Sequence, residues 1–279
     1  MRPFTISMVN FKGGSAKSVS AIHLAYSLSA RGPVLYVDLD NSADATESLL
    51  SDYTDAMLEA ANAFTYLTGE TKLGDSIFKG EKAPFSVLPA TLDLFDLSYE
   101  ATKKPSIMRK LYNDLPRLNE ERAAAGQEPF QFAIIDIPGN PQVEAPIAML
   151  TADVILITVT PRLWAVKGVR KVLDALRDQA PDIIDLRGAM PSIKILYSGF
   201  GKSKRHQEIL GDLRATVKSL EKDQEIRESF GMDRLNMSGL PEIPSSDSIV
   251  ERAESGLALP KNSSGWTVFE DIARKVVKA

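Results

Sequence analysis

The sequence has 279 residues, of which 44% are hydrophobic and 25% charged, a balance that allows a globular chain to bury a full core. The net charge of −4 argues against a wholly basic protein, so any contact with nucleic acid must come from a local patch. The absence of cysteine fits a reducing compartment and excludes a thiolate-held iron–sulfur cluster. No apolar run approaches the ~20 residues of a membrane helix, and we expect a cytoplasmic protein without a signal peptide.

Residues 11–18 have the spacing of a phosphate-binding loop. They read Phe-Lys-Gly-Gly-Ser-Ala-Lys-Ser, after an apolar run at 4–9 that predicts a strand and before a helical pattern at 19–30. Glycines let backbone N–H groups converge on phosphate oxygens, and the start of a helix adds a positive dipole. Lys17 would then reach the β- and γ-phosphates, and the Ser18 hydroxyl would bind Mg²⁺. A plain strand-to-helix turn with two solvated lysines is the alternative, which the order and spacing disfavour.

The form K-G-G-x-x-K-[ST] resembles the deviant Walker A loop of the ParA/MinD family of ATPases. The resemblance implies that ATP and Mg²⁺ are cofactors, that Lys17 and Lys12 are catalytic, and that Lys12 reaches the nucleotide of a partner subunit. Ala16 replaces the usual glycine, and its methyl group fits the loop if the local φ is negative. The implied nucleotide-binding residues here are Lys12, Gly13, Gly14, Ser15, Ala16, Lys17, Ser18 and Val19.

A second apolar run, at 34–40, ends in the pattern Asp-Leu-Asp. Ligands of doubly wound sheets bind at the carboxyl ends of the strands, which places Asp38 and Asp40 beside the loop. The pattern resembles the family's switch I, in which the second acid orients the attacking water. Asp40 is therefore implied as a catalytic residue that also lies at the metal site. Capping of the next helix, predicted at 43–50, is the alternative for both acids.

A third run, at 132–136, ends in Asp136 before a Pro-Gly turn and resembles the family's Walker B strand and switch II. The resemblance implies that Asp136 holds Mg²⁺ together with Ser18. Ile137 and Gly139 replace the usual threonine and second proline, which predicts a more mobile turn. Capping of the following helix is again the alternative.

The rest of the chain alternates strand and helix patterns, without repeats or linkers. This alternation predicts a single P-loop ATPase domain over 1–279, with a doubly wound, mostly parallel sheet and helices on both faces. Further strands are predicted at 85–90, 152–161 and 193–200, further helices at 54–68, 103–122, 163–179, 248–255 and 264–277, and one or two helices at 207–230.

Two C-terminal segments also resemble parts of the family. The proline-bounded loop at 240–247 is similar to the segment that backs the adenine ring, which implies nucleotide contacts from Pro241, Ile243 and Pro244. The last predicted helix, at 264–277, has one apolar face. We expect this face to pack on the core, with a MinD-like membrane-targeting helix as the alternative.

The resemblance implies a ParA-type ATPase of the small kind, because the loop at residue 12 leaves no room for an N-terminal helix-turn-helix. Such a protein forms an ATP-dependent sandwich homodimer on nucleoid DNA, which it binds without sequence preference. It hydrolyses ATP weakly until a ParB-like adaptor stimulates it, and it partitions a plasmid or chromosome. The candidate DNA contacts, for which a solvated surface is an equal alternative, are Lys167, Arg170, Lys171, Lys202, Lys204, Arg205, Arg214 and Lys218.

Three other interpretations stay open. A relative could position a protein cargo, such as carboxysomes or chemoreceptor clusters, on the nucleoid. A MinD-like regulator would bind a membrane, which the sequence disfavours. A nucleotide-dependent scaffold without hydrolysis would result if Asn41 and Ser42, which replace the usual Pro-Gln of switch I, abolish turnover.

Overall fold

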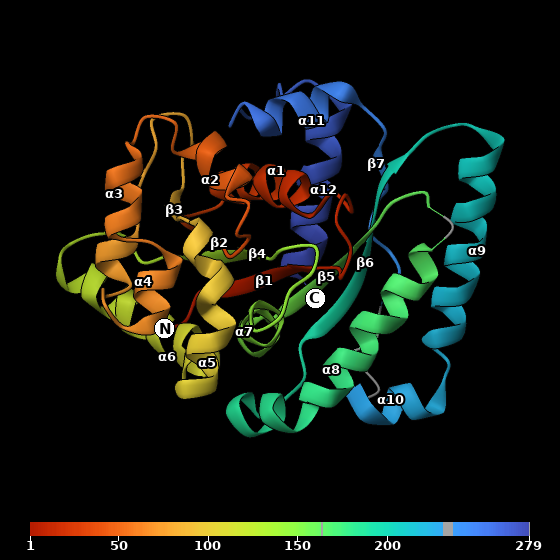
Figure 1. The fold of residues 1–279 in the computed structure, drawn as a ribbon. Helices are drawn as coiled ribbons and strands as arrows, with labels where there is room; N and C mark the ends of the chain where they lie inside the picture. Colours follow the sequence, from red (N-terminus) through yellow and green to blue (C-terminus); the bar gives the residue numbers. More distant parts are fainter. Residues whose placement is uncertain (163, 231–236, 279) are drawn as a thin grey trace.

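Seven parallel strands form one sheet in the part of the chain that this computed structural model describes, residues 1–162, 164–230 and 237–278 (Figure 1). Their order is β3-β2-β4-β1-β5-β6-β7, so β1 lies at the centre. The strands β1, β2, β4 and β5 are mostly apolar and almost wholly buried, as expected for a sheet covered on both faces. Their bounds are β1 Phe4–Val9, β2 Val34–Asp38, β3 Ser86–Leu88, β4 Phe132–Asp136, β5 Val154–Val159, β6 Ser192–Phe200 and β7 Ile243–Pro244.

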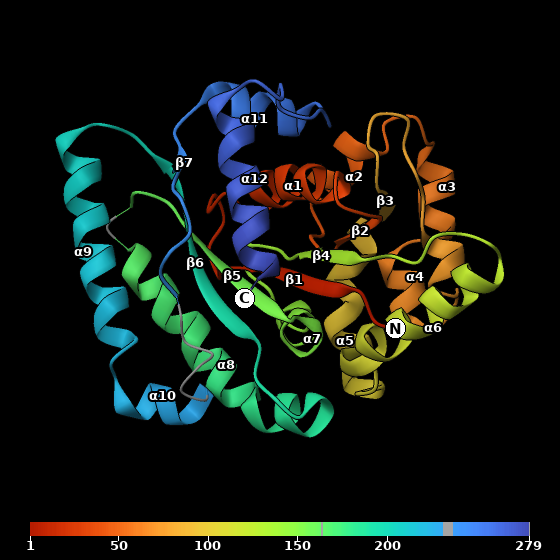
Figure 2. The same cartoon turned by 180° about the vertical axis from the view of Figure 1, so that it is seen from behind.

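Helices cover both faces of the sheet, which confirms the predicted doubly wound α/β class. Helices α1, α11 and α12 pack on one face, and α6, α7 and α8 on the other (Figures 1 and 2). The helix bounds are α1 Lys17–Ser29, α2 Asp44–Leu49, α3 Asp55–Ala60, α4 Ala63–Thr68, α5 Leu97–Lys103, α6 Ile107–Ala124, α7 Glu144–Thr151, α8 Ala165–Arg187, α9 Lys204–Leu220, α10 Gln224–Phe230, α11 Asp247–Glu254 and α12 Ser264–Val277, with short 3₁₀ turns at Gly74–Ser76 and Leu92–Asp96.

The topology leaves a crevice at the centre of the carboxyl edge. From β1 the chain passes through α1 to β2 on one side, whereas from β4 it passes through α7 to β5 on the other side of β1. The loops after β1 and β4 therefore leave neighbouring strands in opposite directions. In open α/β sheets this is where ligands bind.

Two helices predicted in the first half are wrong in extent. The single helix expected at 54–68 is two helices, because Asn62 interrupts it and caps α4, with Oδ1 accepting from the Thr65 N–H at 3.0 Å. The helix expected to begin at Lys103 instead begins at Ile107, and Lys103 ends α5. Pro105 explains this break, because it disfavours helical backbone at Lys104, where φ is −135° and ψ is 79°.

The second half differs less from the prediction. The helix after β5 continues past Gln179 to Arg187, and its predicted start at Leu163 lies outside the described residues. Helix α9 begins at Lys204, three residues before the start predicted at 207, and the predicted loop at 240–247 contains the short strand β7.

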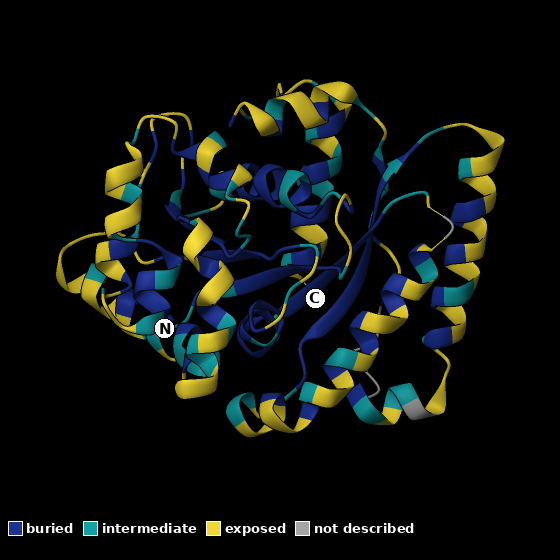
Figure 3. Ribbon diagram, in the orientation of Figure 1, coloured by how far each residue is buried: buried dark blue, intermediate teal, exposed yellow. Residues whose placement is uncertain are grey.

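Helix α12 packs on the core, as expected, with Phe269, Ile272, Ala273 and Val276 fully buried. Figure 3 shows the same pattern throughout, with buried strands and exposed outer helix faces. No helix in the described ranges is long and apolar enough to cross a membrane.

Candidate functional site

The glycine-rich loop crosses the carboxyl edge of the sheet between β1 and α1. Lys12, Gly13 and Gly14 are exposed, whereas Ser15 is buried and accepts a hydrogen bond of 3.3 Å from the Thr158 hydroxyl of β5. The loop is therefore anchored on one side and open to solvent on the other. This arrangement leaves its backbone N–H groups accessible to an anion.

Ala16 has a left-handed backbone, with φ of +62°, so the negative φ that would have let its methyl group fit without strain is not adopted. This conformation costs a residue with a Cβ roughly 1–2 kcal/mol, and glycine is its usual occupant. The Ala16 carbonyl accepts from Ser20 N at 3.1 Å, which begins the hydrogen-bond ladder of α1. The strain is thus held by the helix that follows.

Lys17 is only 5% exposed, although it carries an ammonium group. Its Nζ donates to the carbonyl oxygen of Lys12 at 3.4 Å. Burial lowers the pKa of Lys17, and the carboxylates of Asp136 and Asp40 act in the opposite direction. The ammonium group is therefore held inside the loop and close to two acids.

Asp136, at the end of β4, is fully buried. Its Oδ2 accepts from the Tyr36 hydroxyl at 3.1 Å, while Oδ1 has no hydrogen-bond partner among the described residues. Burial raises the pKa of Asp136 to about 6, and the nearby groups of Lys17 and Ser18 lower it in part. One carboxylate oxygen is thus fixed and the other is unpartnered.

The free oxygen of Asp136 and the nearby Ser18 hydroxyl fit a magnesium ion that is shared with a nucleotide. Mg²⁺ prefers hard oxygen ligands and is commonly held by one or two carboxylates together with substrate phosphates. Asp136 and the Ser18 hydroxyl supply such ligands at one point. The described residues contain no group of three or more acidic, histidine or cysteine side chains that could hold a metal without phosphate.

The two acids that end β2 have different environments. Asp38 is fully buried and accepts from the N–H of Asp40 at 3.0 Å and from the N–H and hydroxyl of Thr46, in α2, at 3.0 and 2.7 Å. The structure thus favours the capping alternative for Asp38. Burial, with the charge of Asp136, raises its pKa to about 8. Asp40 is partly exposed, and its Oδ1 accepts from Ser42 N at 3.0 Å, before the helix begins.

The turn after β4 lies directly on the phosphate-binding loop. A Cβ built on Gly139 would lie 2.5 Å from the backbone nitrogen of Gly13 and 2.6 Å from its Cα. No side chain fits at this position in the present arrangement. Gly139, which the sequence linked only to mobility of the turn, therefore permits a close backbone contact between the turn and the loop.

The remaining predicted nucleotide contacts are dispersed. Ile243 is 1% exposed and belongs to the core, while Pro244 is half-buried and pairs with Phe200 of β6. Pro241 lines a surface hollow with Arg31, beyond the end of α1 that lies away from the loop. Val19 is half-buried in the first turn of α1.

The candidate DNA contacts are all exposed and lie in α8, in α9 or, for Lys202, directly before α9. Lys167, Arg170 and Lys171 lie in the first two turns of α8, while Lys204 and Arg205 begin α9 directly after Lys202. Both helices start at the carboxyl edge of the sheet, so these two groups share an edge with the loop.

Two further candidates on α9 have different surroundings. Arg214 forms an ion pair with Glu242. Lys218 lies 14 residues after Lys204, or about 21 Å along the helix at ~1.5 Å per residue. These two residues are therefore separate from the basic groups at the carboxyl edge.

Sequence reasoning missed two side chains at the loop. The Tyr36 hydroxyl donates to Asp136, and a hydroxyl among the apolar residues 34–37 was the available signal. Arg162 follows β5, and its Nη2 would lie 3.4 Å from a Cβ built on Gly14. Neither Arg162 nor the ammonium group of Lys12 has an acidic partner among the described residues.

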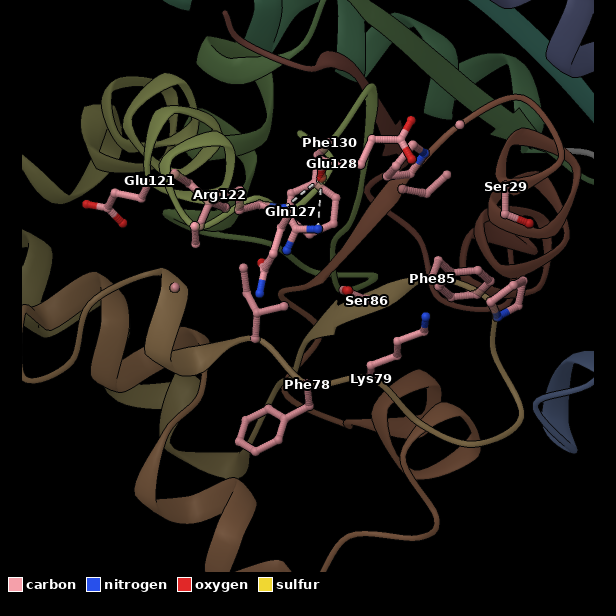
Figure 4. A pocket seen from close by; sticks show the side chains of 18 of the residues that line it. Ser29, Phe78, Lys79, Phe85, Ser86, Glu121, Arg122, Gln127, Glu128 and Phe130 are labelled. Carbon is pink, nitrogen blue, oxygen red and sulfur yellow. Dashed lines mark hydrogen bonds between the residues drawn. The ribbon is translucent and has the colours of Figure 1, made fainter.

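A wide cavity of about 810 Å³ lies at the opposite edge of the sheet (Figure 4). Pro33, Ser86 and Phe130, which line it, stand at the amino ends of β2, β3 and β4. Its Arg122 already donates to the Glu128 carbonyl at 2.9 Å. None of the predicted site residues lines this cavity.

Comparison with known proteins identifies one family and several similar chains. The family model for an AAA domain, AAA_31, matches residues 4–182. The chain is 27% identical over 169 residues to the chromosome partitioning protein ParA of Caulobacter vibrioides, a match that covers 60% of each protein. The match thus spans about three-fifths of the length of that curated relative.

Two solved structures show the same fold at low identity. A complex of Cyanothece McdA with ATP has a TM-score of 0.75 at 16% identity, covering 99% of this chain and 96% of that one. Cobyrinic acid a,c-diamide synthase from Mycobacterium smegmatis, with bound ADP and magnesium, has a TM-score of 0.74 at 18% identity, with coverages of 99% and 94%. The second likeness shows that a synthase also has this fold.

Proposed function

Because this chain belongs to the AAA_31 family, the ParA/Soj family of P-loop ATPases, we propose that it is a Mg²⁺-dependent ATPase of the ParA type. In this proposal residues 1–279 act as one ATPase domain that dimerises with ATP, binds DNA without sequence preference and partitions a plasmid or chromosome. A ParB-like adaptor stimulates an otherwise weak hydrolysis. The protein would act on the nucleoid, in the cytoplasm.

The observation that carries the proposal is the position of one buried cation. Lys17 is buried at the end of the glycine-rich loop and interacts electrostatically with Asp136 and Asp40, which lie at the carboxyl ends of two other strands. A buried ammonium group is costly unless negative charge compensates it. The two carboxylates do so here in part, and nucleotide phosphates bound in the loop would complete the compensation.

Each residue then has a defined role in binding. The backbone N–H groups of the loop, residues 13–19, hold phosphate oxygens, and Lys17 contacts the β- and γ-phosphates. Ser18 and Asp136 would hold Mg²⁺, which supplies charge neutralisation on the phosphates. Pro244 and the backbone of β7 would contact the base.

Hydrolysis requires a positioned water molecule. Asp40 is proposed to orient this water, because it is the partly exposed acid of the pair whereas Asp38 is committed to α2. Orientation by a carboxylate near the γ-phosphate lowers the barrier through positioning.

Lys12 is proposed to act on the nucleotide of the partner subunit. Its side chain is exposed and has no hydrogen-bond or ionic partner within the described ranges. A second cation beside Lys17 would repel it unless phosphate charge lay between them. In a face-to-face dimer, the nucleotide of the partner provides that charge.

The proposal is tested by binding random-sequence DNA with ATP, with ADP and without nucleotide. The parent should bind DNA only with ATP. Lys17→Ala should lose nucleotide binding altogether, whereas Lys12→Ala should bind ATP but lose ATP-dependent dimers, hydrolysis and DNA binding together. Lys261→Ala, which removes an exposed lysine elsewhere, is the control and should match the parent.

Mixing subunits tests whether Lys12 acts in trans. In a mixed dimer of Lys12→Ala and Asp40→Ala, one of the two sites has both an intact Asp40 and an intact partner Lys12. Partial hydrolysis should therefore return. Normal dimerisation and hydrolysis by Lys12→Ala alone would contradict the assignment of a trans-acting lysine.

A further inference from the structure

Tyr36 is the third residue of β2 and is fully buried. It stacks on Phe85 at 6.3 Å between ring centroids, so its ring is held by the core. In the sheet Tyr36 pairs with Ile134 and Asp38 pairs with Asp136, so Tyr36 and Asp136 are diagonal neighbours on adjacent strands. The Tyr36 hydroxyl reaches Asp136 Oδ2 at 3.1 Å.

This hydrogen bond distinguishes the two oxygens of Asp136. Oδ2 is occupied by the phenol, whereas Oδ1 is buried and has no hydrogen-bond partner in the described part of the chain. A buried oxygen without a donor is costly, so such an atom in a native site calls for an additional partner. The Ser18 hydroxyl and the Lys17 ammonium group, both at the end of the phosphate-binding loop, are close enough to this carboxylate to lower the pKa of Asp136.

We propose that Tyr36 is a positioning residue for Mg²⁺, because its hydroxyl fixes the Asp136 carboxylate so that Oδ1 is presented to the ion. The inference rests on the proposed function, in which Asp136 holds Mg²⁺. Partners that orient a metal-binding carboxylate typically contribute about 10–100-fold to metal affinity. The other residues of β2 are the aliphatic Val34, Leu35 and Val37 and the acid Asp38, which accepts hydrogen bonds from Thr46, so none of them offers a hydroxyl in place of Tyr36.

A second buried tyrosine provides a matched control. The Tyr66 hydroxyl donates to Asp114 Oδ2 at 3.2 Å, and Tyr66 is also fully buried. This pair joins α4 to α6 and belongs to the other layer of the core. Tyr66→Phe therefore removes the same kind of hydrogen bond without touching the loop.

The experiment titrates Mg²⁺ into the full-length protein with a fluorescent ADP analogue, for the parent, Tyr36→Phe and Tyr66→Phe. We expect Tyr36→Phe to raise the Mg²⁺ concentration at half-saturation by about tenfold or more. Its affinity for the analogue in EDTA should equal that of the parent, and Tyr66→Phe should match the parent in both measurements. Direct binding of Mn²⁺, followed by electron paramagnetic resonance, should show the same weakening.

Two results would overturn the inference in different ways. The parent and Tyr36→Phe could reach half-saturation at the same Mg²⁺ concentration while binding by the parent depends on Mg²⁺. In that case the hydrogen bond to Asp136 serves only to pair the buried hydroxyl of Tyr36, and the proposed function stands. If the parent binds the analogue in the loop without any response to Mg²⁺, the metal role of Asp136 fails, and the role of Tyr36 fails with it.

Discussion

Gly139 and Gly13 are in backbone contact across the candidate site, so that a Cβ on Gly139 would lie 2.5 Å from the nitrogen of Gly13. The contact joins the turn after β4 to the phosphate-binding loop. It also explains why glycine stands where the family resemblance leads one to expect proline. A proline ring at this position would separate the two segments in the present arrangement.

Gly139→Ala should therefore destabilise the nucleotide-free protein by about 1–3 kcal/mol, the usual cost of overpacking against atoms that cannot yield. Urea unfolding without nucleotide measures this loss. Gly211→Ala is the control with the opposite sign, because its Cβ meets nothing within 4 Å in α9 and alanine favours a helix by about 1 kcal/mol. Equal stabilities of Gly139→Ala and the parent would show that the turn is free to move away.

Ala16→Gly should stabilise the protein by about 0.5–1 kcal/mol, because release of left-handed strain exceeds the added flexibility of the unfolded chain. Ala43→Gly is the matched change outside the loop, since Ala43 has a φ of +56° at the start of α2. Thermal unfolding of both variants should show similar gains. A loss of stability in Ala16→Gly would mean that its methyl group contributes packing that outweighs the strain.

Asp40→Ala should leave ATP binding and ATP-dependent dimers intact but lower the rate of hydrolysis at least about 100-fold, the scale of lost general acid–base assistance. Single-turnover hydrolysis and sedimentation with ATP measure the two properties. Asp44→Ala removes an exposed acid at the start of α2 and should hydrolyse ATP like the parent. Parental turnover in Asp40→Ala would assign Asp40 to the turn with Ser42 instead.

Replacing Lys202, Lys204 and Arg205 with alanine should weaken binding to random-sequence DNA and flatten its salt dependence. Each lost phosphate contact lowers the log–log slope by about 0.9, so the slope should fall by two to three units. The control is a triple alanine variant of Lys72, Lys79 and Lys82, which are exposed in the segment that precedes β3. An unchanged slope would show that these three residues do not contact DNA, and the basic residues in the first two turns of α8 would become the candidates.

The stability should depend on pH through His23. This residue is 1% exposed, its Nε2 lies 2.7 Å from the carbonyl of Ile249, and burial lowers its pKa below 6.5. Below about pH 6.5 the unfolded histidine binds a proton that the folded one does not. The free energy of unfolding therefore decreases as the pH is lowered from about 6.5 to the pKa of the folded histidine. The slope is at most about 1.4 kcal/mol per pH unit.

His23→Gln, which retains a donor for the Ile249 carbonyl, should show a weaker loss of stability between pH 7 and pH 5. Urea unfolding at several pH values gives the free energy of unfolding of the parent and the variant as a function of pH. The slopes of the two curves are compared, because loss of the ring lowers the stability of the variant at every pH. Parallel curves would show that His23 accepts a proton in the folded state as readily as in the unfolded one.

The strands of the sheet could be predicted because their signal is local. Each of β1, β2, β4 and β5 is a mostly apolar run long enough for a strand buried on both faces, and β2 and β4 end in the acids Asp38 and Asp136, which mark the carboxyl edge. Helix bounds were less accurate where a cap or a proline decided them, as at Asn62 and Pro105.

Features of the site that depend on contacts between distant segments could not be predicted. The sequence shows that Asp38 and Asp40 lie two residues apart, but only the position of Thr46 shows that Asp38 is committed to α2. The partner of Asp136 lies 100 residues earlier, in Tyr36. The positive φ of Ala16 arises because the loop must turn sharply into α1, and no feature of an alanine indicates it.

Gly256, which follows α11, joins two parts of the molecule that the chain separates by some 200 residues. Its backbone is left-handed, and a Cβ there would lie 2.0 Å from the carbonyl oxygen of Ser48 in α2. The Ser48 hydroxyl also donates to the backbone carbonyl of Glu254, in α11, at 2.9 Å. Because the two segments are in close contact here, a shift of α2 must either move α11 with it or open a gap between the two helices. The segment that follows Asp40 and the segment after β7 are thereby mechanically linked through the contact between α2 and α11.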